Sequence, residues 1–163
     1  MKPDIKVRPF IPGDEDELVP LIVGIQNREF KIPISAEDQP DLMDIPEFYQ
    51  SGSGNFWVAE CGGSIVGTVA LLDIGGGQAA LRKMFVDAEF RGGGAGTAGL
   101  LLETLFAWAG ENSVGQIFLG TTSKFHAAHR FYEKNGFIEI EKALLPDTFP
   151  VMSVDTKFYV IRS

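Results

Sequence analysis

Cysteine and histidine are scarce in this sequence. Of 163 residues, one is cysteine (Cys61) and two are histidine (His126 and His129). A single thiol cannot form an internal disulfide, and the two histidines could bind a metal only with partners that the sequence does not identify. We therefore expect no disulfide framework and no metal site, and we expect a reducing, cytoplasmic setting.

Long apolar runs and an excess of positive charge are also missing. The longest apolar stretches fall far short of a membrane span, and Met1 to Asp4 lead directly into polar sequence without a secretory signal. The net charge is −8, from 22 acidic and 14 basic residues. Sequence-independent nucleic-acid binding needs a basic surface. We therefore expect neither a membrane nor a nucleic acid as a partner.

Most of the acidic excess lies in the first third of the chain. Residues 1–50 hold eleven acids and five bases, which is −6 of the total −8. Either this surface attracts a cationic substrate, or residues 14–17 form the first turn of a helix, where carboxylates interact favourably with the helix dipole. The second interpretation is the simpler one.

Length and composition predict one globular domain spanning 1–163. With 45% apolar and 22% charged residues, the chain can bury a sizeable core, and it contains no repeat or interdomain linker. Apolar periodicity predicts helices over 15–28, 46–50, 98–108 and 124–134, with Gly110 ending the third. Strand-like patterns cover 5–8, 56–60, 64–73, 79–86, 116–121, 137–144 and 154–162. This order predicts a mixed sheet in an α/β or α+β domain.

A glycine-rich segment separates the apolar run 81–86 from the helix predicted at 98–108. It reads Arg91-Gly92-Gly93-Gly94-Ala95-Gly96-Thr97. Glycines leave backbone N–H groups uncovered by side chains. These donors lie where a helix begins, so the unpaired N–H groups and the positive end of the helix dipole face the same point. The segment therefore predicts a phosphate-binding loop, with Arg91 as an additional ligand.

Two well-known phosphate loops fit this segment poorly. A Walker A loop needs a lysine after its last glycine, but Thr97 follows Gly96 here. A dinucleotide fingerprint is matched in letters by residues 94–99, but the next strand ends in residues 119–121 without the acid that this site requires. A Walker-type ATP site and a nucleotide-binding oxidoreductase are therefore disfavoured.

A third phosphate loop fits both the position and the neighbours of this segment. Residues 84–97 resemble the pyrophosphate loop of the GCN5-related N-acetyltransferases, in which a strand runs into Val-x-x-x-x-Arg-Gly-x-Gly-x-Gly/Ala. Residues 131–137, Phe-Tyr-Glu-Lys-Asn-Gly-Phe, resemble the second signature of that family. The resemblance implies a mixed, mostly antiparallel central sheet of six to seven strands flanked by about four helices.

The resemblance also implies acetyl-CoA as the cofactor. The loop residues that would bind its pyrophosphate through backbone N–H groups are Arg91, Gly92, Gly93, Gly94, Ala95, Gly96 and Thr97. The strand residues Met84, Phe85 and Val86 would pair with the pantetheine amides, because this family splays that strand from its neighbour, here residues 116–121. Phe125 and Ala128 would line the same groove. Plain burial of Met84 and Val86 in a core strand is the alternative.

Tyr132 would be the general acid. It shares one face of the last predicted helix with Phe125, Ala128 and His129, at spacings i, i+3, i+4 and i+7. In the family's reaction an amine attacks a thioester and a thiolate leaves. A phenol with a pKa of ~10 can protonate a thiolate whose thiol has a pKa of ~8.5. The alternative is a core aromatic whose hydroxyl is satisfied by other groups.

The sequence departs from the family pattern at two places. Phe125 stands where many members carry an asparagine, and residues 79–83 offer no carboxylate as a general base. An alkyl amine is mostly protonated at neutral pH. Removing its proton costs roughly 4 kcal/mol, because its pKa lies about three units above the pH. Glu29, Glu60, Asp73 or a water chain would have to remove that proton.

We therefore expect an N-acetyltransferase that moves an acetyl group from acetyl-CoA directly to the amine of a small molecule or peptide. The resemblance suggests acceptor contacts at Glu29 and Phe30 and in the segment 145–152. It also suggests a homodimer, since pairs built through the last strand are common in such folds. A non-catalytic acyl-CoA-binding module of the same fold is the alternative, because no base is identified.

Overall fold

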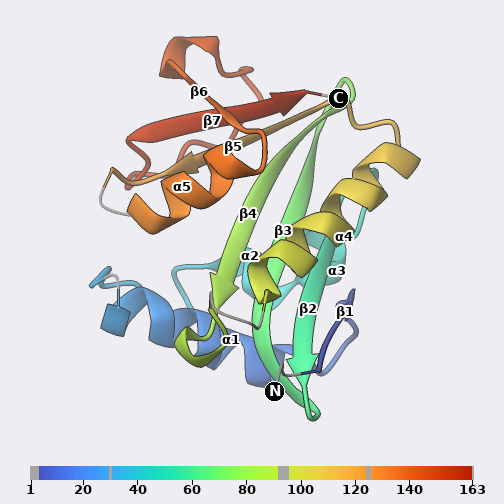
Figure 1. The fold of residues 1–163 in the computed structure, drawn as a ribbon, viewed down its shortest axis with the longest axis vertical. Coiled ribbons are helices and arrows are strands. Elements are labelled where there is room, and N and C mark those ends of the chain that lie inside the picture. Colours follow the sequence, from blue (N-terminus) through green and yellow to red (C-terminus); the bar gives the residue numbers. More distant parts are fainter. Residues whose placement is uncertain (1–3, 30, 92–95, 124–125, 163) are drawn as a thin grey trace.

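A single seven-stranded sheet forms the centre of the molecule (Figure 1). The computed structural model describes residues 4–29, 31–91, 96–123 and 126–162. The strands are β1 (Ile5–Pro9), β2 (Asn55–Cys61), β3 (Ser64–Gly75), β4 (Gln78–Val86), β5 (Gln116–Thr121), β6 (Ile138–Ile140) and β7 (Lys157–Arg162). Their spatial order is β1-β2-β3-β4-β5-β7-β6. Among the described strands only β4 and β5 pair in parallel, so the predicted mixed and mostly antiparallel sheet is confirmed.

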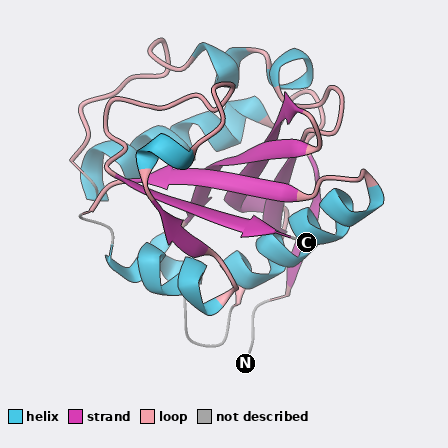
Figure 2. Ribbon diagram, turned by 90° about the horizontal axis from the view of Figure 1, so that it is seen from above, coloured by secondary structure: helices cyan, strands magenta, loops and turns pink. Residues whose placement is uncertain are grey.

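Helices cover both faces of the sheet (Figure 2). The α-helices are α1 (Glu15–Gly24), α2 (Pro40–Met43), α3 (Ile45–Phe48), α4 (Thr97–Glu111) and α5 (His126–Lys134). The helix predicted over 15–28 is α1 together with a π-helical turn, Ile25–Glu29, that continues it. Short 3-10 turns lie at Ala88–Phe90 and Lys142–Leu144.

Alternation along β2 directs side chains into two of the three buried apolar clusters of the described residues. Trp57 of β2 packs in one cluster with Leu101 of α4, and its neighbour Phe56 packs in another with Leu18 and Ile22 of α1. Successive strand side chains point to opposite faces of a sheet. Consequently α1 covers one face and α4 the other, and α5 joins the α4 side because Tyr132 belongs to the same cluster as Leu101.

The prediction that Gly110 ends its helix is wrong. Helix α4 continues to Glu111, and Gly110 does not adopt a positive φ. The left-handed residue after this helix is Ser113, with a φ of 60°. The backbone N–H of Val114 donates to the carbonyl of Ala109 at 2.9 Å and closes the helix end. The turn therefore forms one residue beyond the C-cap without needing glycine.

The last two predicted strands are shorter than expected. The strand predicted over 137–144 extends only over Ile138–Ile140 and then gives way to a 3-10 turn. The strand predicted over 154–162 begins at Lys157, because a turn precedes it in which the N–H of Asp155 donates to the carbonyl of Met152 at 3.0 Å. Strand β7 lies between β5 and β6, so it is not an edge of the sheet.

Strands β4 and β5 separate after three residue pairs (Figure 1). Pairing joins residues 78–80 to residues 116–118, and the rest of β4 has no strand partner on this side among the described residues. A bulge in β4 accompanies the separation: Lys83 has a φ of 54°, and its carbonyl accepts a hydrogen bond from Thr68 Oγ1 at 2.7 Å. The expected splay is therefore present.

Within the described part of the chain, no helix combines the length and the apolar character that crossing a membrane requires.

Candidate active site

Two cavities border the separated part of β4. The larger has a volume of about 960 Å³ and extends from the π-helical turn to α5. The smaller has a volume of about 250 Å³ and is lined on one side by the loop before β7. Met84 and Phe85 of β4, with Ala128 and Tyr132 of α5, line both cavities. A molecule in each cavity would therefore meet its neighbour at these four residues.

Most of the described residues that were predicted to contact a cofactor line the larger cavity. Met84, Phe85, Val86, Arg91 and Ala128 all line it. The predicted residues Gly92, Gly93, Gly94, Ala95 and Phe125, and the acceptor candidate Phe30, lie outside the described residues.

The end of the glycine loop leads directly into α4. Gly96 adopts a left-handed φ of 65°, and a side chain there would meet nothing within 4 Å. Thr97, the first residue of the helix, is fully buried, and its hydroxyl has no hydrogen-bond partner in the part of the chain that the structure describes. Ala98 in the first turn lines the larger cavity. The start of α4 therefore borders this cavity with backbone donors that the helix itself does not use.

Arg91 is held in the larger cavity by two partners. Its Nε donates to the carbonyl of Val86 at 2.7 Å. Its Nη1 lies 2.5 Å from Oε1 of Glu29, and its Nη2 lies 2.7 Å from Oε2 of the same carboxylate. Glu29, which the sequence suggested as an acceptor contact or base, thus lies in the larger cavity in a paired arrangement with Arg91.

Tyr132 stands where the two cavities meet. It is 7% exposed and packs against the rings of Phe137 and Tyr159, with centroids 5.6 and 6.1 Å away. Among the described residues its hydroxyl has no hydrogen-bond partner, so the alternative of a satisfied core phenol finds no support there. Burial raises the pKa of this phenol above its ordinary value of 10.0, and the hydroxyl therefore keeps its proton at neutral pH.

The smaller cavity is lined by two cations, Arg82 and Lys83. Lys83 Nζ lies 3.4 Å from Oδ2 of Asp41 and donates to Oε1 of Gln39 at 2.6 Å. Tyr49 donates to the same Asp41 oxygen at 2.6 Å. Burial lowers the pKa of Lys83 despite the nearby carboxylate. Lys83 is thus fixed in a buried polar network.

Asp155 supplies the only carboxylate that lines the smaller cavity among the described residues. Met152 donates its backbone N–H to Oδ2 of Asp155 at 2.9 Å. The carboxylate packs against the backbone of β5, where a Cβ on Gly120 would come within 2.6 Å of Oδ2. Burial raises the pKa of Asp155, against the opposing effects of the Met152 N–H and of Arg82.

Sequence reasoning did not identify Asp155. The predicted acceptor segment 145–152 ends three residues before it, and Phe149, Pro150 and Met152 from that segment do line the smaller cavity. No local motif marks an aspartate that reaches the site from an irregular loop.

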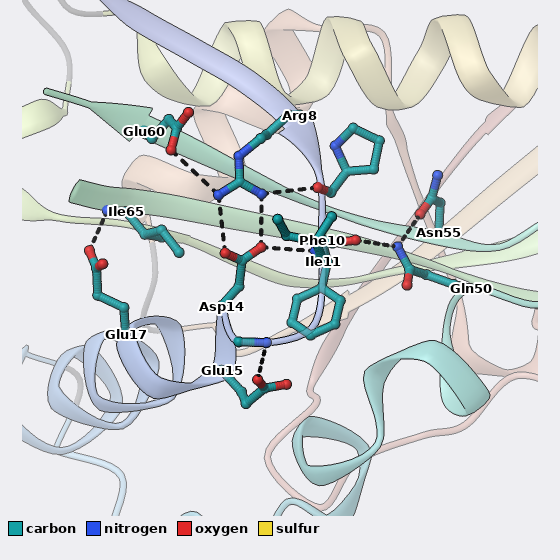
Figure 3. Close-up of polar contacts among 12 residues, drawn as sticks. Arg8, Phe10, Ile11, Asp14, Glu15, Glu17, Gln50, Asn55, Glu60 and Ile65 are labelled. Atoms are coloured by element: carbon teal, nitrogen blue, oxygen red, sulfur yellow. Dashed lines mark hydrogen bonds and ion pairs between the residues drawn. The ribbon is translucent and has the colours of Figure 1, made fainter. Parts of the chain in front are cut away.

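The other two acids considered as bases lie outside both cavities. Glu60 Oε2 is 3.4 Å from Arg8 Nη2, which also binds Asp14 (Figure 3). Asp73 accepts hydrogen bonds from the backbone N–H groups of Ser53 and Gly75, at 3.2 and 2.8 Å. Both carboxylates therefore hold the scaffold together.

The acidic cluster at the start of α1 also has structural partners (Figure 3). Asp14 pairs with Arg8 at 2.8 Å, which lowers the pKa of its carboxyl. Glu15 accepts a hydrogen bond from Gly13 and Glu17 one from Ile65. The simpler interpretation of the acidic excess, a helix first turn, fits these contacts.

Comparison with known proteins relates this chain to acyl-group transfer. The family model for the acetyltransferase (GNAT) family matches residues 20–137. A curated relative from Mus musculus, "Probable N-acetyltransferase family 8 member 5", is 33% identical over 125 residues. That match covers 74% of this chain and 54% of the relative, so the chain spans about half the length of this curated protein.

Solved structures share the whole fold. The crystal structure of an acetyltransferase of the GNAT family from Staphylococcus aureus Mu50 is 37% identical, has a TM-score of 0.93, and covers 98% of this chain and 99% of its own. The PaiA N-acetyltransferase from Thermoplasma acidophilum, crystallised with coenzyme A, is 14% identical with a TM-score of 0.77, and covers 98% and 99% of the two chains. At that identity the second structure supports the fold alone.

Proposed function

The chain belongs to the acetyltransferase (GNAT) family, whose cosubstrate is acetyl-CoA, and we propose that it transfers the acetyl group directly to the amine of a small molecule. The observation that carries this proposal is the junction of the two cavities at Met84, Phe85, Ala128 and Tyr132. Donor and acceptor can occupy separate cavities and react at the shared wall. Positioning two reactants in this way supplies much of the rate enhancement of a bimolecular step.

The residues of the larger cavity fit the cosubstrate. Arg91 and Lys31 bring positive charge to the cavity, and the start of α4 contributes unpaired backbone donors. The unpaired side of β4 at Met84 to Val86 can hydrogen-bond an extended amide chain. When bound, acetyl-CoA supplies a thioester whose carbonyl carbon is the site of attack.

Tyr132 acts as the proton donor in this proposal. Its hydroxyl keeps its proton and can donate to the departing sulfur. Complete transfer from a phenol of pKa ~10 to a thiolate of conjugate pKa ~8.5 costs about 2 kcal/mol, and burial of the phenol adds to this cost. Tyr132 therefore stabilises the thiolate by hydrogen bonding first and releases its proton as the carbon–sulfur bond breaks.

Asp155 acts as the proton acceptor on the amine side. Its carboxylate accepts one proton from the ammonium group of the acceptor and leaves a neutral amine that can attack. Because the pKa of Asp155 is raised, it differs less from the pKa of an ammonium group, and proton transfer to the carboxylate costs less free energy. The proton then passes to solvent at the cavity opening, and the second amine proton restores Tyr132 after the amide forms.

Substitution of Tyr132 by phenylalanine tests the proposal. Thiol release from acetyl-CoA is measured across a panel of amines, together with coenzyme A affinity by calorimetry. We expect Tyr132→Phe to lower kcat by on the order of 100-fold while affinity stays within about two-fold, since only a proton donor is lost. Tyr159→Phe is the matched control, because it removes a hydroxyl that donates to Glu133 outside both cavities.

Two results would contradict the proposal. Coenzyme A binding without thiol release on any amine would favour the non-catalytic acyl-CoA-binding module. Equal loss of kcat in Tyr132→Phe and Tyr159→Phe would remove the proton donor from the mechanism, because both changes would then act through packing.

We also propose a cytoplasmic setting and a homodimer. The single cysteine supports the first, since it needs no oxidising compartment. For the second, the edge strand beyond β7 is β6, where Ile138 is 60% exposed and offers an apolar contact. Light scattering coupled to size-exclusion chromatography would show a monomer if this pairing does not occur.

A further inference from the structure

The smaller cavity is lined by charged groups of both signs. These groups are Arg82, Lys83 and Asp155. Because Asp41 compensates Lys83 from 3.4 Å away, Arg82 and Asp155 remain as one cation and one anion at the place where an amine has to bind. Arg82 would repel an acceptor that carries positive charge alone.

The two cations differ in how far the protein neutralises them. Lys83 has its own counter-ion, Asp41, at 3.4 Å, and both side chains are 8% exposed. Arg82 has no acid within ion-pair distance among the described residues. Among these residues the half-buried guanidinium therefore has no ion pair, although Asp155 lines the same cavity, where Arg82 opposes the burial that raises the pKa of Asp155.

Arg82 is nevertheless held in place by uncharged groups. Its guanidinium carbon lies 5.7 Å from the ring centre of Phe48 and 6.0 Å from that of Tyr49. Its Nη2 lies 3.5 Å from the sulfur of Met152. Aromatic faces and a thioether orient a guanidinium while leaving most of its five N–H donors unused. Such a group binds a planar carboxylate through two parallel hydrogen bonds.

Arg82 and Asp155 are linked through Met152. The Met152 sulfur contacts Arg82, and the Met152 N–H donates to Asp155. Through Met152, the loop before β7 therefore contacts the anion-binding guanidinium of Arg82 on β4 and places the Asp155 carboxylate in the same cavity. An acceptor with neighbouring carboxylate and ammonium groups matches both.

We propose that the acceptor is a small amine that carries a carboxylate, of the amino-acid class, and that Arg82 binds this carboxylate while the amine faces Asp155 and Tyr132. This inference rests on the proposed acetyl transfer. The volume of about 250 Å³ is small beside the roughly 300–1,000 Å³ of typical ligand sites. It suits a single amino acid better than a peptide. The acceptor carboxylate compensates Arg82, and the acceptor ammonium group is compensated by Asp155.

Matched pairs of acceptors test the proposal. Alanine is compared with ethylamine and phenylalanine with phenethylamine, so that each pair differs only by the carboxylate. Thiol release from acetyl-CoA gives kcat/KM for each compound. We expect each amino acid to exceed its amine by at least about tenfold, the value of one charge-assisted contact. Equal values, or higher values for the amines, would overturn the inference.

Variants of Arg82 assign the difference to this residue. Arg82→Gln should abolish the preference within each pair, mainly through a higher KM for the amino acid, and Arg82→Lys should restore it in part. Arg162→Gln, an exposed arginine near the end of β7, is the control and should keep the full preference. A preference that survives Arg82→Gln would overturn the assignment.

Binding measurements separate this inference from the proposed function. The same amino acids are dialysed to equilibrium against the protein saturated with coenzyme A. Binding that Arg82→Gln removes, without any thiol release, would support the acceptor class and contradict catalysis. Absence of binding and of turnover for every amino acid, with coenzyme A still bound, would overturn the inference.

Discussion

Arg91 and Glu29 face each other through two short contacts in the larger cavity, Nη1–Oε1 at 2.5 Å and Nη2–Oε2 at 2.7 Å. The pair joins the segment that leads into the glycine loop to the π-helical turn after α1. Arg91 was predicted to bind phosphate, and Glu29 now occupies the groups that would do so. If Arg91 binds the diphosphate as predicted, the diphosphate and Glu29 would compete for one guanidinium.

We predict that Glu29→Gln tightens coenzyme A binding by about two- to five-fold. The change removes an anion that competes with phosphate for Arg91, and a partly exposed ion pair of this kind is worth up to about 1 kcal/mol. Calorimetry at low and high salt measures the effect, which should shrink with added salt. Glu103→Gln, an exposed change on α4, is the control. Weaker binding in Glu29→Gln would mean that Glu29 positions Arg91 for the ligand.

Asp155→Asn should lower activity and raise stability at neutral pH. Folding raises the pKa of this carboxyl above its ordinary value of 3.8, so its ionised form is less stable in the folded protein than in the unfolded chain. Its contribution to stability is present below pH 3.8 and disappears as the pH rises through the raised value. Asparagine keeps an acceptor for the Met152 N–H, so we expect a higher Tm at neutral pH and no gain in acid.

The same variant tests the role of Asp155 as a base. Wild-type kcat/KM should fall as the pH drops through the pKa of Asp155, and this acid limb should be absent in Asp155→Asn, whose rate is low throughout. Tyr132 should stay protonated up to alkaline pH because burial raises its pKa. An unchanged acid limb in the variant would assign the titration to another group.

The Lys83–Asp41 pair should be strongly coupled in stability. Asp41→Asn keeps the hydrogen bond with Tyr49 but leaves Lys83 buried without a counter-ion, which typically costs about 3–5 kcal/mol. Lys83→Met removes the charge and leaves Asp41 with its Tyr49 partner. We expect the double variant to lose less stability than the sum of the two, by about 1–3 kcal/mol in denaturant unfolding. Additive losses would mean that the two charges do not stabilise each other.

Local patterns predicted the fold well, because each element depends on consecutive residues. Alternating apolar residues defined the strands, and the family resemblance implied the splayed pair β4 and β5. The predictions of helix ends and helix type were wrong where the backbone could adopt more than one conformation. Gly110 seemed suited to end α4, but Ser113 adopts the left-handed conformation instead. The π-helical turn at Ile25–Glu29 has no simple periodicity that would set it apart from an α-helix.

Sequence patterns pointed to more residues of the larger cavity than of the smaller one. Arg91 and Tyr132 belong to compact motifs, and both line the larger cavity as the resemblance suggested, although their contact with a cofactor stays a prediction. The smaller cavity, where we propose that the acceptor binds, is assembled from segments far apart in the chain. Arg82 lies beside a bulge in β4, and Asp155 lies in an irregular loop, so neither is marked by neighbours in sequence.

Two glycine substitutions should have opposite consequences. Gly120 lies in β5 under the Asp155 carboxylate, and a Cβ there would come within 2.6 Å of Oδ2 and 2.7 Å of Cγ. Gly120→Ala should push Asp155 and its loop away from the smaller cavity. We expect kcat/KM to fall at least about tenfold with coenzyme A affinity unchanged, because the larger cavity does not include Gly120.

Gly110→Ala is the matched change in open space. A Cβ at this position meets nothing within 4 Å, and the residue lies inside α4. Alanine loses less backbone entropy on folding than glycine, so this variant should gain roughly 0.5–1 kcal/mol of stability without a change in activity. Gly120→Ala cannot show that gain, because the displaced loop offsets it. Full activity in Gly120→Ala would mean that the chemistry does not depend on where Asp155 lies.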